Sequence, residues 1–383
     1  MKNSEPAMRK IQMVDLQTQY QAIKADIDAG IADVIASAAF IKGKKVADFQ
    51  EHLQAHLGVK HVIPVGNGTD ALQIALMALG LQPGDEVITP TFTFIATAEV
   101  VALLHLKPIV VDVDWETMNM DVEALCRAIT PRTKAIVPVH LFGQCANMER
   151  IMQVAQEYGL YVVEDACQAI DAEYTFPDGR TKKAGCMGDI GCTSFFPSKN
   201  LGCYGDGGAI FTNNDELADA MRAIANHGMV VRYHHDRVGV NSRLDSIQAA
   251  VLDAKLPHLE EYTRRRQQAA ERYDRGFREN PHLLIPRHEA GSTHVYHQYT
   301  LRLQGVDRDN LRDRLAEKGI PAMVYYPVPL HLQKAYRDPR YQTGDFPVAE
   351  RLAACVLSLP MHTELEDEQI EYIIAEVNRL TSY

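Results

Sequence analysis

Short apolar runs alternate with amphipathic segments along the chain from about residue 60 onward. The runs have the length of strands, and Gly, Pro and Asp separate them from segments whose apolar positions recur with helical spacing. The predicted strands are residues 62–65, 86–89, 109–113, 135–139 and 160–164. The predicted helices between them are residues 69–79, 93–105, 121–129 and 147–157. Such alternation predicts βαβ units and a largely parallel sheet.

The pattern changes twice further along the chain. Apolar runs at 190–196 and 208–212 follow one another without a helical segment, which predicts antiparallel pairing and hence a mixed, mostly parallel seven-stranded sheet. A predicted helix at 244–256 precedes a long charged helix from about residue 255, which leads into a smaller α+β domain. The elements predicted there are strands at 294–303 and 322–328 and helices at 308–318 and 365–380. The predicted division is an N-terminal arm at 1–20, a large α/β domain at 21–258 and a small domain at 259–383.

Composition narrows the class of protein. The net charge of -11 argues against nucleic acid or an anionic membrane as a partner, because both require a basic face. No apolar stretch approaches the roughly 18 residues of a membrane span, and the N-terminal sequence lacks the apolar centre of a signal peptide. Seven dispersed cysteines without a C-x-x-C pair are typical of reduced thiols. The sequence therefore predicts a soluble cytoplasmic protein.

A glycine-rich loop follows the first predicted strand. Residues 66–71 read GNGTDA, the G-x-G-x-x-A pattern of dinucleotide-binding loops. A dinucleotide site also needs an acidic residue at the end of the second strand, where this chain has Thr89 to Phe92, so that interpretation fails. A helix N-terminus with Gly66, Gly68 and Thr69 still favours a phosphate. The alternative left open by the loop alone is that Asn67 or Thr69 only caps the helix.

Chemically useful side chains follow the other predicted strands. They are Phe94 after the second, His140 after the fourth, Asp165 and Gln168 after the fifth, and Ser194 and Lys199 after the sixth. The carboxyl ends of strands in an open α/β sheet form the ligand site. Pyridoxal phosphate (PLP) needs a lysine, a carboxylate for its ring nitrogen, an aromatic face and phosphate donors, and this set supplies them. Taken singly, each residue has an ordinary alternative: a solvated lysine, a capping aspartate or a core phenylalanine.

Several motifs together resemble the DegT/DnrJ/EryC1/StrS family of sugar aminotransferases, which have the aspartate aminotransferase-like fold (PLP fold type I). The most specific is SFFPSKNLGCYGDGGAI at 194–210, and EDACQA at 164–169 and TFTFIATAE at 91–99 accompany it. The resemblance implies that Lys199 is the Schiff-base lysine and that Asp165 pairs with the pyridine nitrogen. It also implies roles for other residues around the cofactor: Gln168 at the ring hydroxyl, Phe94 stacked on the ring, and Ser194, Gly68 and Thr69 at the phosphate.

Two further segments acquire roles from the same resemblance. In RVGVNSRLDSIQAA at 237–250, Asn241 is similar to a residue that reaches the cofactor phosphate of a neighbouring subunit, which implies a homodimer with shared active sites. Arg243 is then a candidate ligand of the substrate diphosphate, and Tyr325 and Tyr326 belong to a substrate-facing loop. The alternative for the first segment is a polar turn before the helix at 244–256. The alternative for Tyr325 and Tyr326 is the aromatic end of a strand. The histidine-rich stretches YHHD and HVYH lack partners at metal-ligand spacing, so no metal site is predicted.

The family also contains sugar dehydratases, in which histidine replaces the lysine, so Lys199 favours aminotransfer. The chain resembles most the bacterial aminotransferases that act on UDP-2-acetamido-2-deoxy-3-oxo-glucuronate for surface polysaccharide, with glutamate as the expected donor. The alternatives are a UDP-linked 3-oxo-glucose, a dTDP-3-oxo-6-deoxy sugar, a 4-keto sugar and, in a different class, a PLP-binding regulator without turnover. Two features depart from relatives: Asp171, where Gly is usual, and a basic insertion at 175–185 near the expected pocket rim.

Overall fold

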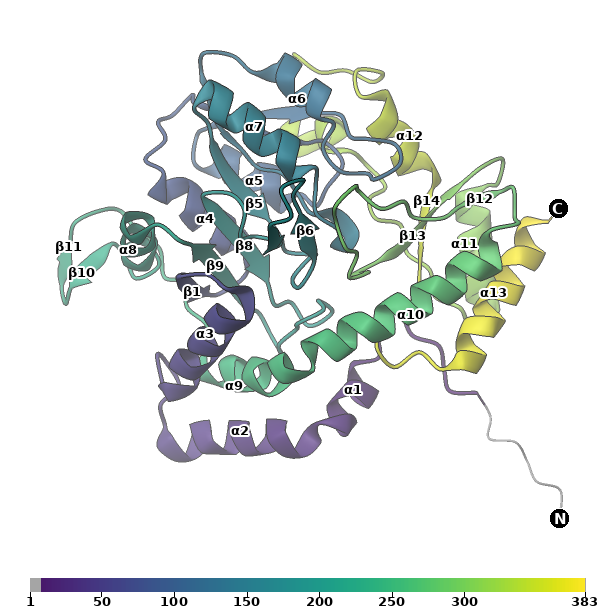
Figure 1. Cartoon of the computed structure of the whole chain (residues 1–383), viewed down its shortest axis with the longest axis horizontal. Coiled ribbons are helices and arrows are strands. Elements are labelled where there is room, and N and C mark those ends of the chain that lie inside the picture. Colours follow the sequence, from purple (N-terminus) through teal and green to yellow (C-terminus); the bar gives the residue numbers. More distant parts are fainter. Residues whose placement is uncertain (1–7, 383) are drawn as a thin grey trace.

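The computed structural model describes residues 8–382 and contains a seven-stranded mixed sheet (Figure 1). The strand order is β1-β9-β8-β5-β4-β2-β3. The strands are β1 (His61–Val65), β2 (Glu86–Pro90), β3 (Lys107–Val111), β4 (Thr133–Ile136), β5 (Tyr161–Asp165), β8 (Ile190–Ser194) and β9 (Gly208–Thr212). Strand β9 pairs antiparallel with both β1 and β8, whereas the other pairs are parallel. The predicted mixed, mostly parallel sheet is confirmed.

Helices cover both faces of this sheet, which explains why its strands read as nearly continuous apolar runs. Successive residues point to opposite faces: Val87 of β2 packs in the core with α4, α5 and α8, and Ile88 packs in the core with α6 and α7. These helices are α4 (Gly68–Ala78), α5 (Ala96–Leu103), α6 (Val122–Ala128), α7 (Met148–Tyr158) and α8 (Asp215–Ile224). A further core beside β1 and β9 is formed with α3 (Lys44–Leu57) and α9 (Ser246–Lys255).

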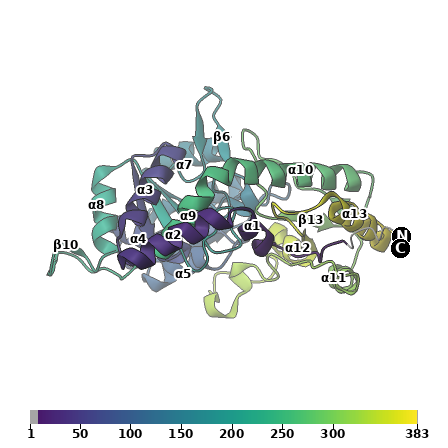
Figure 2. The ribbon, with the colours of Figure 1, turned by 90° about the horizontal axis from the view of Figure 1, so that it is seen from below.

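A second, smaller sheet lies beside the first (Figure 2). Its antiparallel strands are β12 (Leu283–Leu284), β13 (Tyr299–Leu303) and β14 (Val356–Leu359). The helices around it are α10 (Leu259–Phe277), α11 (Arg308–Glu317), α12 (Pro347–Cys355) and α13 (Asp367–Thr381). The fold class, a large α/β domain with a smaller α+β domain, is thereby confirmed.

Helix α10 connects the two cores. Leu259 at its start is buried with α3 and α9, whereas Tyr273 and Phe277 near its end are buried against β13 and α13. The boundary at residue 258 stays a prediction. The predicted arm at 1–20 lies partly outside the described residues. Ile11 is buried in the smaller core, and α1 (Leu16–Ala22) and α2 (Lys24–Ser37) follow it along the large unit.

The prediction of a strand at 322–328 was wrong. Within this stretch only Met323 makes a β-bridge, to Ser358, and the strands that pair along β13 are β12 and β14. Pro327 and Pro329 lack amide hydrogens and so cannot extend a ladder. The prediction at 294–303 was too long, because residues 294–298 leave the sheet to contact residues 142–144. The sequence did not predict the three helices within residues 16–57. It also did not predict two hairpins, β6–β7 (Glu173–Thr175 and Thr181–Lys183) and β10–β11 (Met229–Val231 and His234–His235).

Within residues 8–382, the helices are all too short or too polar to cross a membrane.

Candidate active site

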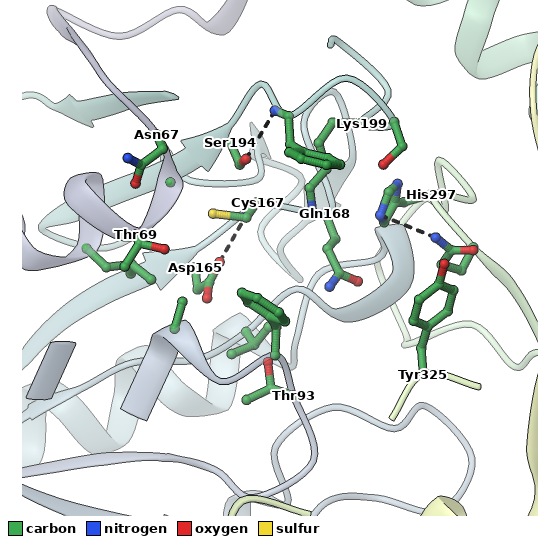
Figure 3. Close-up of a pocket in the computed structure, with 18 of the residues that line it drawn as sticks. Asn67, Thr69, Thr93, Asp165, Cys167, Gln168, Ser194, Lys199, His297 and Tyr325 are labelled. Carbon is green, nitrogen blue, oxygen red and sulfur yellow. Dashed lines mark hydrogen bonds between the residues drawn. The ribbon is translucent and has the colours of Figure 1, made fainter. Parts of the chain in front are cut away.

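A cavity of about 620 Å³ lies at the carboxyl ends of the central strands (Figure 3). It collects side chains from seven segments that are far apart in sequence. The predicted residues that line it are Gly68, Thr69, Phe94, Asp165, Gln168, Ser194, Lys199, Tyr325 and Tyr326. In Figure 3, Asn67 and Thr69 lie at one side of the cavity, and His297 and Tyr325 lie at the other. The structure therefore brings together nine of the predicted site residues, whereas Gly66, His140, Asn241 and Arg243 are outside this lining. His140 is buried beside β5, where its Nε2 lies 2.8 Å from Glu164 Oε2.

One end of the cavity is built from the first turn of α4. Asn67 caps the helix, because its Oδ1 accepts a hydrogen bond of 2.8 Å from the amide of Asp70. The amides of Gly68 and Thr69 have no hydrogen-bond partner among the described residues. A Cβ on Gly68 would lie 2.8 Å from both Cys167 Sγ and Ser194 Cβ, so only glycine lets the helix approach so closely. Capping and anion binding are thus compatible at this terminus.

Asp165 ends β5 and is buried at the base of the cavity. Its Oδ2 accepts a hydrogen bond of 2.8 Å from Thr97 Oγ1, and its Oδ1 accepts one of 3.2 Å from the amide of Cys167. These bonds hold the carboxylate in a fixed orientation. Thr97 was not predicted from sequence, because a threonine within an apolar helix gives no sign of a partner 68 residues away.

Lys199 lies in the connection between β8 and β9. Burial lowers the pKa of its ammonium group below the usual 10.5, although nearby Cys167 and Asp165 act in the opposite direction. A lowered pKa makes the unprotonated amine, which is the nucleophilic form, more available at neutral pH. The adjacent residue anchors this loop, since Asn200 Nδ2 donates a 2.9 Å hydrogen bond to the carbonyl of Val295.

Gln168 joins two walls of the cavity. Its Oε1 accepts a hydrogen bond of 2.9 Å from the amide of Phe142, and its Nε2 donates one of 2.9 Å to Tyr326 Oη. Burial raises the pKa of Tyr326, so the phenol stays protonated. The ring of Phe94 is 52 % exposed, so it is an open face of the cavity and not a core residue.

Asn241 and Arg243 do not line the cavity of their own chain. Asn241 is exposed and Arg243 is half-buried, and Ser242 between them is buried. Ser242 Oγ donates a 2.6 Å hydrogen bond to Asp70 and accepts one of 2.9 Å from the amide of Gly66. The segment is therefore fixed to the back of the phosphate loop, while its outer side chains stay clear of this cavity.

Sequence reasoning missed several residues that line the cavity. They are Asn67, Asp70, Thr93, Cys167, Phe196, Ser198, Asp206, His297 and Gln298. His297 and Gln298 come from the stretch that was assigned to a strand, which hid their approach to the site. Burial and the nearby charge of Lys199 keep the pKa of His297 well below its usual range, so the ring is neutral.

The basic insertion at 175–185 does not reach the cavity. Arg180 pairs with Asp178, and Lys183 pairs with Asp171 and Glu173. Asp171 itself has φ of +73°, which explains why glycine suits this position. Among the described residues, no group of three His, Cys, Asp or Glu side chains is placed to hold a metal ion.

The DegT/DnrJ/EryC1/StrS aminotransferase family matches residues 21–378. The chain belongs to this family. Among similar proteins, the UDP-2-acetamido-2-deoxy-3-oxo-D-glucuronate aminotransferase of Pseudomonas aeruginosa is 48 % identical over 95 % of this chain and 99 % of its own. A pleiotropic regulatory protein of Geobacillus stearothermophilus is 46 % identical over 96 % and 97 %. The UDP-N-acetyl-3-dehydro-alpha-D-glucosamine 3-aminotransferase of Acidithiobacillus ferrooxidans is 45 % identical over 96 % and 97 %.

A solved structure with bound cofactor is similar over the whole chain. The structure of NtdA from Bacillus subtilis with its cofactor PMP (pyridoxamine phosphate) has a TM-score of 0.89 and 31 % identity, and the match covers 100 % of this chain and 87 % of that one. The DegT/DnrJ/EryC1/StrS aminotransferases are PLP-dependent, so the predicted enzyme class and cofactor are confirmed.

The residues of this cavity fit the cofactor of the family. Two amides without partners and the hydroxyls of Thr69 and Ser194 suit the phosphate, and the Asp165 carboxylate suits the ring nitrogen. Ser194 Oγ accepts a bond from the amide of Phe196, so its own hydrogen is free to be donated. PLP supplies an electron sink that stabilises negative charge on the substrate carbon and carries the amino group between substrates.

Proposed function

We propose that this chain transfers an amino group from glutamate to C3 of UDP-2-acetamido-2-deoxy-3-oxo-glucuronate, as a step in the synthesis of a surface polysaccharide. We propose further that it works in the cytoplasm as a homodimer with shared active sites. One observation carries the choice of reaction: Lys199, Asp165 and the open amides of α4 line one cavity, in a chain 48 % identical to an aminotransferase of that name.

Each residue has a definite task in this proposal. Gly68, Thr69 and Ser194 hold the cofactor phosphate, Asp165 accepts a hydrogen bond from the ring nitrogen, and Phe94 covers one ring face. Lys199 Nζ takes the proton that leaves Cα of glutamate and later delivers a proton to C3 of the sugar. Its lowered pKa suits both directions of transfer near neutral pH.

The remaining proposed residues act on the sugar nucleotide. Tyr325 and Tyr326 form the substrate-facing side of the cavity. Asn241 of each subunit contacts the cofactor phosphate of the other, and Arg243 contacts the substrate diphosphate. Lys199 and the neutral His297 are the only Lys, Arg or His side chains among the described residues that line this cavity, so a diphosphate needs positive charge from elsewhere. That requirement supports the proposed shared site.

The test follows the absorbance of the cofactor through each half-reaction. The enzyme is converted to its amine form with glutamate, freed of amino acid, and mixed with one keto-sugar nucleotide at a time. We expect the aldehyde band to return with UDP-2-acetamido-2-deoxy-3-oxo-glucuronate and not with a 4-oxo sugar. Return only with the 3-oxo-glucose or 6-deoxy analogue, or only with a 4-oxo sugar, would contradict the proposed substrate.

A PLP-binding regulator without turnover is the second candidate, and the name of the relative from Geobacillus stearothermophilus is the observation that favours it. The same experiment separates the two functions. A regulator would show the cofactor band but no change with any amino donor or keto sugar. Lys199→Ala serves as the matched control, because it removes the proton carrier and leaves the phosphate cradle in place.

A further inference from the structure

The loop that carries Tyr325 and Tyr326 is fixed to the end of β2 by a buried histidine. His331 is 4 % exposed and lies five residues after Tyr326. Its Nδ1 lies 2.9 Å from Thr91 Oγ1, and its Nε2 lies 3.1 Å from Glu350 Oε1. None of these three residues lines the cavity described above.

The bonding pattern assigns the protons of this triad. Nε2 faces a carboxylate, so it carries hydrogen and donates, which leaves Nδ1 as an acceptor for the hydroxyl of Thr91. The Thr91 oxygen in turn accepts the amide of His331 at 3.3 Å. Glu350 Oε1 also accepts the amide of Gly344 at 2.8 Å. The imidazole is thus bonded at both nitrogens, and its orientation is fixed.

Two walls of the cavity meet at this point. Thr91 directly precedes the segment that ends in Phe94, and its carbonyl accepts the amide of Leu330 at 2.8 Å. On the loop side, the ring of Tyr326 lies 6.3 Å from that of Phe92 and 6.2 Å from that of Phe94. Because Tyr325 lies opposite Thr69 in Figure 3, this loop bounds the end of the cavity away from the phosphate.

We propose that His331 is a positioning residue that sets the spacing between Phe94 and the Tyr325–Tyr326 loop, and thereby the fit of the sugar nucleotide. Resting on the proposed function, this inference assigns His331 to sugar binding and not to proton transfer. Glutamate is far smaller than a sugar nucleotide and gives its Cα proton to Lys199, so we expect the first half-reaction not to depend on this spacing. Removing the bond to Thr91 should therefore affect the two substrates differently.

The experiment compares Thr91→Val, His331→Ala and the double variant in the holoenzyme. Thr91→Val keeps the shape of the side chain and removes only the hydroxyl. We expect KM for the keto-sugar nucleotide to rise about tenfold in each variant, the equivalent of about 1.4 kcal/mol. The rate of the glutamate half-reaction and the cofactor absorbance should stay within about twofold of wild type. Since both variants break the same contact between His331 and Thr91, the double variant should be little worse than His331→Ala.

Matched variants distinguish positioning from general stability. His362→Ala removes another buried imidazole outside the cavity and should leave KM unchanged. His331→Gln retains a donor for Glu350 and should recover part of the sugar affinity. An unchanged KM in Thr91→Val, or equal losses in both half-reactions, would overturn the assignment of His331. If wild type accepts a different keto sugar, the proposed substrate fails, and the same comparison with the accepted sugar still decides the role of His331.

Discussion

At the scale of single residues, the burial of the reactive Lys199 side chain lowers the stability of the folded protein. Burial lowers the pKa of its ammonium, because water solvates the charged form better than the folded interior does. In protein without cofactor, this penalty is present at pH values below the lowered pKa. It declines as the pH rises and disappears above the unfolded value of 10.5.

Lys199→Met should therefore stabilise the cofactor-free protein while abolishing aminotransfer. We expect the free energy of unfolding at pH 7 to rise by about 1 kcal/mol, since a methionine of similar length buries no charge. The gain should shrink as the pH approaches 10.5. Urea denaturation at several pH values measures this, and a variant less stable than wild type at pH 7 would contradict it.

Asp171 is a second residue whose environment explains its identity. Its carboxylate accepts hydrogen bonds from His56 of α3 at 2.8 Å, from Lys183 of β7 at 2.6 Å and from Thr263 of α10 at 3.1 Å. Burial alone would raise its pKa, but the bonds from His56 and Lys183 outweigh burial and lower it. The residue thus joins three elements, at a backbone angle that favours glycine.

Asp171→Ala should lower the free energy of unfolding by about 3 kcal/mol, because it breaks a buried ion pair from one side and retains the positive φ. Asp171→Gly loses the same bonds without that strain, so it should be about 1 kcal/mol more stable than the alanine variant. The folded-state pKa is lowered, so the contribution is present above pH 3.8 and is lost as the pH falls further. Equal stability of the two variants would contradict the role of φ.

At the scale of elements, the N-terminus of α4 combines a structural cap with a ligand site. Asn67 bonds the amide of Asp70, and in the same way Asn214 caps α8 (Asp215–Ile224), whose N-terminus is outside the cavity, by bonding the amide of Leu217. The two asparagines have the same capping role, but only Asn67 stands beside the amides that we propose bind the cofactor phosphate.

Asn67→Ala and Asn214→Ala should each lower the free energy of unfolding of the cofactor-free protein by about 1 kcal/mol. Only Asn67→Ala should also weaken PLP binding, which can be measured by titrating the cofactor-free protein and following absorbance. Equal PLP affinity in the two variants would mean that the start of α4 caps a helix and does nothing more.

The elements that could be predicted are those whose pattern depends on neighbours in sequence. Strands β1, β2, β5 and β9 and helices α4 and α7 agree within a few residues, since each has a regular apolar period and a clear Gly, Pro or Asn boundary. The stretch 322–328 was wrongly predicted to be a strand, because its aromatic residues Tyr325 and Tyr326 give an apolar pattern but line the cavity. Contacts such as those of Thr97 and His331 depend on tertiary packing, which periodicity does not encode.

At the scale of the whole molecule, the proposed homodimer places residues of one chain in the site of the other. Asn241 lies on the outer surface of a segment whose inner side bonds Asp70 and Gly66. If it completes the site of a partner, each cavity requires Lys199 from one chain and Asn241 from the other.

Mixing two inactive variants tests this arrangement. When Lys199→Ala and Asn241→Ala subunits are unfolded together and refolded, half of the dimers are hybrids, and each hybrid holds one intact site. About a quarter of wild-type activity should return, whereas either variant refolded alone stays inactive or weak. No recovery in the hybrid fraction, purified by two different affinity tags, would contradict sharing.

The burial of Ile11 has a consequence for how the protein is made. The core that buries it also contains Ile370, Ile373 and Leu380 of α13, more than 350 residues later in the chain. During synthesis the segment around Ile11 is made before all of these residues, so the core that buries it stays incomplete until α13 has left the ribosome. An interrupted chain therefore displays an apolar segment near its beginning, where a chaperone or protease can recognise it as unfinished.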